Sequence, residues 1–378
     1  MSKKRSIFED VSNDTPKQVT PKGGLIDKGS SGARNGVSVW LMILFAMVAL
    51  IIVVGGLTRL TDSGLSITEW ALVKGAVPPM NDLDWAVVFE KYKKSPEYLL
   101  QNAQMTLEEF KKIYWWEWSH RQLGRFIGLV WVVGFILFAI TKHIPKGWTP
   151  RLIFIGFLGG LQGAIGWWMV SSGLTGRMVD VASYRLATHL GLAFIILGTI
   201  AWYIWLLRRK DTDLFQARRQ ADPGLVRLGK ILLILTFAQV LLGALVAGID
   251  AGRGYIDWPM MNGEFLPSES FDYEPFWTNF FENPALVQFN HRMLGYIVFI
   301  ASVIVWLKSR SSALISVKRA FDWVLVAVFG QVVLGIVTIL YAAPWNIAIV
   351  HQIGAIFVVI LMLRACFEAA YPKVQSLK

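Results

Sequence analysis

The sequence predicts an all-α polytopic membrane protein whose eight transmembrane helices form two pseudo-symmetric four-helix bundles. Three observations support this prediction: the composition, eight long apolar segments and an internal repeat. Of the 378 residues, 54% are hydrophobic and 17% are charged, and the mean hydropathy is +0.48. A soluble domain has roughly 25% charged residues. The composition therefore excludes an ordinary soluble enzyme and a disordered scaffold.

Each predicted span is a mostly apolar run of about 20 residues, the length that crosses a bilayer. Residues 1–36 precede the first run and mix acids with bases, unlike a cleavable signal peptide or a transit peptide. We expect them to form a polar cytoplasmic arm. The eight apolar runs are residues 38–58, 121–141, 151–171, 186–207, 230–249, 289–307, 320–341 and 347–367.

The charges of the connecting segments predict the orientation. Residues 142–151, 208–230 and 308–319 are rich in Lys and Arg, whereas residues 250–288 contain seven acids and one Arg. Basic loops stay in the cytoplasm. Both termini are therefore expected inside, and the long loops after the first and fifth spans outside. The net charge of +11 is then a topology signal, and no nucleic-acid partner is expected.

An internal repeat divides the chain into two halves. Residues 55–70 (GGLTRLTDSGLSITEW) align without a gap with residues 243–258 (GALVAGIDAGRGYIDW), 188 positions later. Each half has four spans, so both begin on the same side, and an axis along the membrane normal should relate them. Later spans also match, with HRxLG at 120–124 and 291–295 and QxxxG at 162–166 and 331–335. The predicted units are an arm (1–36), a first half (37–209), a cytoplasmic linker (210–229), a second half (230–368) and a cytoplasmic tail (369–378).

Four of the five histidines lie at the outer ends of the even-numbered spans, one in each, whereas His143 lies in a short cytoplasmic loop. An ionisable residue in a span indicates a functional site. Two imidazoles from facing helices of a bundle suit the axial positions of a porphyrin iron, whereas zinc and copper take three or four ligands. The single cysteine, Cys366, excludes a disulfide framework and a Cys-ligated cluster. The four histidines are His120, His189, His291 and His351.

The two halves differ just before the first histidine of each. Glu117 lies three residues before His120, and Gln288 occupies the matching position before His291. Residues i and i+3 share a helix face, so we expect Glu117 to point toward the cavity of His120. A carboxylate beside a porphyrin can take a proton or stabilise a developing cation, which Gln cannot do. This difference predicts one catalytic half and one half that only holds a cofactor.

Taken together, these motifs resemble the heme A synthase family, in its cysteine-free, proteobacterial and mitochondrial-like branch. The resemblance covers nearly all of residues 38–367. It implies oxidation of the heme O C8 methyl group to the formyl group of heme A, for terminal cytochrome oxidase, with oxygen derived from water. It also implies a bacterial inner-membrane location. The motifs that support it are GGLTRLTDSGLSITEW at 55–70, ExxHR at 117–121, TH at 188–189, NHRMLG at 290–295 and VHQ at 350–352.

The family pattern also implies roles for individual residues. It implies a heme b cofactor held by His291 and His351, and a substrate heme O in the first half near His120 and His189. Glu117 matches the family's essential glutamate. The expected partners are heme O, the lipid bilayer and an unidentified electron acceptor; the sequence leaves open a heme O synthase and further copies of the chain as partners. Two arginines next to histidines are candidate partners of heme propionates, although a snorkelling role toward lipid explains them equally well; they are Arg121 and Arg292.

Two other functions remain open from the sequence. A diheme cytochrome b-type electron carrier would use the four histidines equally well, but it gives no reason for the difference between Glu117 and Gln288. A transporter or a heme-handling protein without chemistry would also accept a parallel repeat. Transporters, however, usually place polar sites near the midplane, whereas these histidines lie toward one face.

Overall fold

The computed structural model describes residues 25–174 and 179–373, with side chains described from residue 32 onward. Within these ranges the chain forms helices and one isolated β-bridge, and no named strand. Eight helices are long and apolar enough to cross a membrane, which confirms the all-α polytopic class. They are α1 (Leu25–Leu60), α4 (Leu107–Ile140), α5 (Thr149–Gly173), α6 (Ser183–Leu207), α8 (Pro223–Gly248), α10 (Pro284–Ser309), α11 (Ile315–Leu340) and α12 (Trp345–Ala370).

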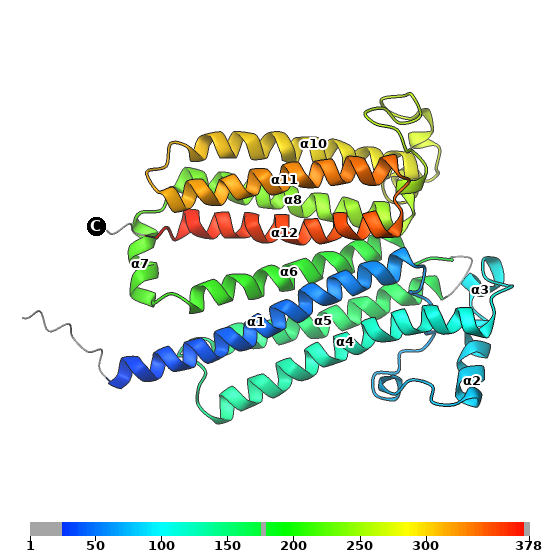
Figure 1. The fold of residues 1–378 in the computed structure, drawn as a ribbon, viewed down its shortest axis with the longest axis horizontal. Helices are drawn as coiled ribbons and strands as arrows, with labels where there is room; N and C mark the ends of the chain where they lie inside the picture. The colour runs from blue at the N-terminus through cyan, green and yellow to red at the C-terminus, as the bar shows by residue number, and fades with distance from the viewer. Residues whose placement is uncertain (1–24, 175–178, 374–378) are drawn as a thin grey trace, which may run out of the picture.

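The spanning helices form two groups that lie side by side (Figure 1). Helices α1, α4, α5 and α6 pack on one another, and so do α8, α10, α11 and α12. The groups meet where α6 contacts α8 and α12, and where α1 contacts α12. At the second contact the Gln352 side chain donates a hydrogen bond of 2.7 Å to the Ile52 carbonyl of α1. The symmetry axis between the groups stays a prediction.

The connections divide between the two ends of the bundle (Figure 1). Helices α2 (Asp82–Tyr92) and α3 (Pro96–Leu100) lie at one end, together with the irregular segment that precedes α10 and contains α9 (Asn279–Glu282). The chain's described ends and α7 (Asp211–Arg219) lie at the opposite end. The two long loops and the two ends of the described chain are therefore on opposite sides, as an even number of spans requires.

Helix α4 begins at Leu107, well before the start predicted at residue 121. A capping box sets this start, because Thr106 accepts a hydrogen bond from the Glu109 backbone and the Glu109 carboxylate accepts one from the Thr106 backbone. Capping depends on these few polar atoms and not on hydropathy. As a result, Glu117 and His120 lie inside one continuous helix.

Helix α1 also begins earlier than predicted, at Leu25, so the last part of the proposed polar arm (residues 25–36) is helical. Residues 1–24 of that arm lie outside the described residues. The Arg34 side chain explains part of this order, because it donates to the carbonyls of Leu206 at 3.0 Å and Leu207 at 3.2 Å. These carbonyls belong to the last turn of α6, whose acceptors have no partner within their own helix.

A glycine of α4 provides a test of the packing between α1 and α4. A methyl group added at Gly134 would lie 2.1 Å from Trp40 Nε1, whose indole is fixed by a 3.1 Å hydrogen bond to the Val130 carbonyl. Gly134→Ala should therefore destabilise the protein by about 1–3 kcal/mol, the usual cost of overpacking. The measurement is thermal unfolding in detergent.

Gly128 on the same helix is the matched control, because an added methyl group there meets nothing within 4 Å. Gly128→Ala should leave the unfolding temperature unchanged or raise it slightly, since Ala favours a helix over Gly. Equal effects of the two substitutions would contradict the packing of Trp40 against Gly134.

Candidate functional site

Each of the four predicted histidines lies against a glycine of the preceding spanning helix. A methyl group added to any of these glycines would lie 2.8–3.1 Å from the imidazole ring. The absence of a side chain therefore makes room for the ring. All four histidines are half-buried. The four pairs are Gly55 with His120, Gly166 with His189, Gly243 with His291, and Gly335 with His351.

The structure brings the four histidines together in two pairs. His120 lies within electrostatic range of His189, and His291 lies within range of His351. The first pair comes from α4 and α6, and the second from α10 and α12. Each group of four helices therefore contains one pair of imidazoles.

Three of the imidazoles are also held by a glutamine. In each case the glutamine Nε2 lies 3.1–3.2 Å from the ring Nδ1 and donates a hydrogen bond to the backbone carbonyl of the same histidine. The sequence repeat pointed to two of these glutamines but missed Gln239, although Gln239 and Gly243 have the same QxxxG spacing. The three pairs are Gln162 with His189, Gln239 with His291, and Gln331 with His351.

This set of donors fits a porphyrin iron better than a bare metal ion. No group of three His, Cys, Asp or Glu residues that could hold a metal ion occurs among residues 25–174 and 179–373. Two neutral imidazoles per bundle are the usual axial ligands of a low-spin heme. In the described part of the chain, the buried Oε1 atoms of Gln162 and Gln239 also lack a hydrogen-bond partner.

Glu117 is buried, with 3% of its surface exposed, and both of its carboxylate oxygens accept hydrogen bonds. Oε2 accepts from Ser66 Oγ and from the Ile67 backbone N–H, each at 2.7 Å. Oε1 accepts from Arg121 Nε at 3.0 Å. Arg121 donates in turn to the carbonyls of Ile67, at 2.8 Å, and Glu69, at 2.9 Å. We call this arrangement the outer clamp of the first half.

The second half has a matching outer clamp built on Gln288 and Arg292. Arg292 donates to Gln288 Oε1 at 2.9 Å and to the carbonyl of Tyr255 at 2.9 Å. The Gln288 amide donates to the carbonyls of Ala251, at 2.8 Å, and Tyr255, at 3.3 Å. Here the outer segment offers acceptors, whereas in the first half Ser66 and Ile67 offer donors. The outer segments therefore offer donors to a carboxyl group in one half and acceptors to an amide in the other.

These contacts refine two expectations from the sequence. Glu117 was expected to point toward the His120 cavity, but its carboxylate is engaged by Ser66, Ile67 and Arg121, while the His120 ring lies against Gly55. The two arginines were considered as propionate partners or lipid-facing residues. In the structure both hold the outer segments, and their pairing with propionates stays a prediction.

An ion-pair cluster around Arg59 lies where the two groups of helices meet. Arg59, in the last turn of α1, lies 2.6 Å from Asp62, 3.0 Å from Asp250 and 3.8 Å from Asp180. Asp250 belongs to the second half, so the cluster joins the two halves. Sequence reasoning missed Arg59, which matches Ala247 in the repeat and so marks another difference between the halves.

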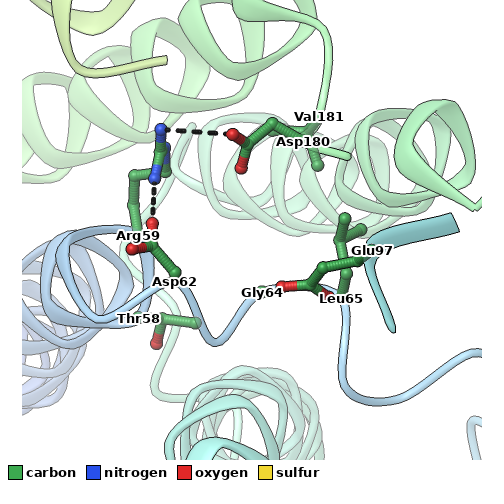
Figure 2. Close-up of a pocket in the computed structure, with 8 residues that line it drawn as sticks. All are labelled: Thr58, Arg59, Asp62, Gly64, Leu65, Glu97, Asp180 and Val181. Atoms are coloured by element: carbon green, nitrogen blue, oxygen red, sulfur yellow. Dashed lines mark hydrogen bonds and ion pairs between the residues drawn. The ribbon is translucent and has the colours of Figure 1, made fainter. Parts of the chain in front are cut away.

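A small cavity beside this cluster contains the carboxyl group of Glu97 (Figure 2). Glu97 is 4% exposed, and its Oε2 has no hydrogen-bond partner within the described residues. Burial raises the pKa of Glu97 to about 8, and the negative charges of Glu117, Asp180 and Asp62 add to the effect. Glu97 is therefore protonated at neutral pH.

The fold and the two histidine pairs define a multi-pass membrane protein whose bundles are suited to bind porphyrin iron. The family model described as "Cytochrome oxidase assembly protein" matches residues 38–363. The heme A synthase of Dinoroseobacter shibae is 62% identical over 379 residues, which cover 100% of this chain and 99% of the relative. The heme A synthases of Ruegeria sp. (strain TM1040) and Paracoccus denitrificans are 57% and 54% identical, over 99% of this chain and 99% and 98% of their own lengths.

This similarity extends over the whole chain and includes both halves. The chain therefore belongs to the heme A synthase family of cytochrome oxidase assembly proteins.

The raised pKa of Glu97 predicts a dependence of stability on pH. Its carboxyl group has a pKa of about 8 in the folded protein and 4.5 as an isolated group. Between these values the folded state keeps a proton that the unfolded state releases, so stability falls as pH rises, by about 1.4 kcal/mol per unit. Glu97→Gln should remove this loss and be more stable than the native protein at pH 8. Thermal unfolding in detergent between pH 5 and pH 8 measures it.

Glu90→Gln is the control, because Glu90 is an exposed carboxylate on the nearby helix α2. It should keep the pH dependence of the native protein. The same pH dependence in Glu97→Gln as in the native protein would show that Glu97 does not hold this proton.

Proposed function

We propose that this protein oxidises the C8 methyl group of heme O to the formyl group of heme A, in the bacterial inner membrane. The change from methyl to formyl takes one water molecule and releases four protons and four electrons, so an electron acceptor is required. Family membership supports the reaction. The observation on this chain that supports it most directly is the pair of outer clamps, which hold a carboxyl group among donors in one half and an amide among acceptors in the other.

The second half is the proposed site of a resident heme b, which His291 and His351 would hold through their imidazoles. Such a heme supplies one-electron transfer when bound. Two features of the chain support this assignment: the glycine contacts, at Gly243 and Gly335, that make room for the rings, and the glutamines that hold both imidazoles. In this half the residue three positions before His291 is Gln288, which has no charge to contribute to a reaction.

The first half is the proposed site of the substrate, heme O, bound near His120 and His189. Glu117 lies one helical turn before His120 and would supply a fixed negative charge at the edge of this site. Its oxygens are held by Ser66, Ile67 and Arg121, so the charge needs no rearrangement to act. Preorganised charge of this kind stabilises positive charge that develops in a transition state. We therefore favour stabilisation of a cationic methyl carbon over removal of a proton from water.

The proposed orientation follows from the charges of the connections. The end of the bundle that carries the described termini and α7 would face the cytoplasm, because its connections are rich in Lys and Arg. Both histidine pairs and both outer clamps would then lie toward the outside. Supply of heme O by a heme O synthase, and association with further copies of the chain, are part of the same proposal.

The test of this function is the heme content of the purified protein, co-expressed with a heme O synthase and analysed by chromatography and mass spectrometry. The native chain should yield heme b together with heme A. Glu117→Gln should accumulate heme O and lose at least about 100-fold in heme A, since removal of one preorganised charge or donor commonly costs this much.

Two controls separate the charge of Glu117 from its place in the clamp. Ser66→Ala removes one hydrogen bond to Oε2 and keeps the carboxylate, so it should retain most heme A formation. Gln288→Glu alters the other clamp, where the carboxylate would face the carbonyls of Ala251 and Tyr255, and it should lower stability without heme O accumulating. Two molecules of heme b per chain in native and Glu117→Gln protein alike would instead indicate a diheme electron carrier.

A further inference from the structure

The contacts of the four histidines are alike except at His120. At the other three histidines, a glutamine lies four residues before the glycine beneath the ring, and this glutamine holds the imidazole. At the corresponding place before Gly55 the chain has Ile51. No side-chain hydrogen bond to the His120 ring occurs within the described residues.

Ile51 occupies the same place in space as its counterpart Gln239. An added methyl group on Gly124 would lie 3.6 Å from Ile51 Cδ1, and one on Gly295 would lie 3.3 Å from Gln239 Nε2. The two glycines match in the repeat, each four residues after its histidine. The register is thus preserved, and only the chemistry of the side chain differs.

The glutamines bond both the ring and the backbone carbonyl of their histidines, so they limit rotation of the imidazole. Groups around a ligating histidine that fix the orientation of its ring commonly change affinity for the metal 10- to 100-fold. Here the glutamine amide does so as a donor, through the histidine carbonyl and one ring nitrogen. An isoleucine can pack against the ring but cannot donate or accept. His120 therefore has one constraint fewer than His189, His291 and His351.

We propose that Ile51 makes His120 the exchangeable axial ligand of the first half, and that the three glutamines are positioning residues that retain heme. The proposal rests on the assignment of the substrate to the first half. A substrate heme must enter and its product must leave, whereas a cofactor must stay. The first half, in which no glutamine holds one of the two imidazoles, suits a heme that is exchanged. The second half, in which a glutamine holds each imidazole, suits a heme that stays bound.

The experiment is the release of hemin to excess apomyoglobin, from purified full-length protein reconstituted with two equivalents of hemin. The native protein should release one hemin faster than the other. Ile51→Gln should slow the faster phase by about fivefold or more, roughly what one hydrogen bond supplies. Gln239→Ile, the reverse substitution at the matching position, should accelerate the slower phase by a similar factor.

Ile51→Met is the matched control, since Met has nearly the length of Gln but no amide. It should release hemin at the native rate, which separates hydrogen bonding from shape. The proposal is overturned if Ile51→Gln and Ile51→Met release hemin at the same rate, or if Gln239→Ile keeps its hemin as long as the native protein. Release is measured without turnover, so the outcome is independent of whether the chain makes heme A.

Discussion

The close approach of each imidazole to a bare glycine is the constraint on which the rest of the site depends. A methyl group at Gly55, Gly166, Gly243 or Gly335 would lie 2.8–3.1 Å from a histidine ring, so the ring or the helix would have to shift. Four such contacts place two imidazoles in each group of helices. The same glycines therefore serve the helical packing and the chemistry of the site. They let the helices approach closely, and they leave room for the imidazole rings.

The outer clamps add function to this shared scaffold. In both halves an arginine one turn after the clamp residue ties the helix to backbone carbonyls of the outer segment. What differs is the side chain that lies between the arginine and the outer segment. Glu117 faces donors and Gln288 faces acceptors, so each outer segment has adapted to its own residue. A duplicated fold has in this way acquired one charged and one neutral site without a change in architecture.

Much of this organisation could be predicted from the sequence, because apolar runs and repeated motifs are local signals. The eight spans, the four histidines and the difference between Glu117 and Gln288 all follow from them. The early start of α4 could not be predicted by hydropathy, because it depends on the capping of Thr106 by Glu109. The polar start of α1 was also missed, because part of its order comes from the hydrogen bonds of Arg34 to the carbonyls of α6 and not from hydropathy.

The contacts of the site were harder to predict, because they join residues that are distant in the chain. Arg59 reaches Asp250 across 191 positions, and Glu117 reaches Ser66 across 51. Which atoms the outer segment presents depends on its path, and no local pattern encodes this. The glutamine at position 239 is a different case, since its spacing from Gly243 repeats that of Gln162 and was visible in the sequence.

The central claim is that the two halves hold different hemes, and an experimental structure of the protein purified with heme O tests it most directly. The account predicts heme b between His291 and His351, and heme O between His120 and His189 with its C8 methyl group toward Glu117. Heme O in the second half, or a C8 methyl group on the side away from Glu117, would contradict it.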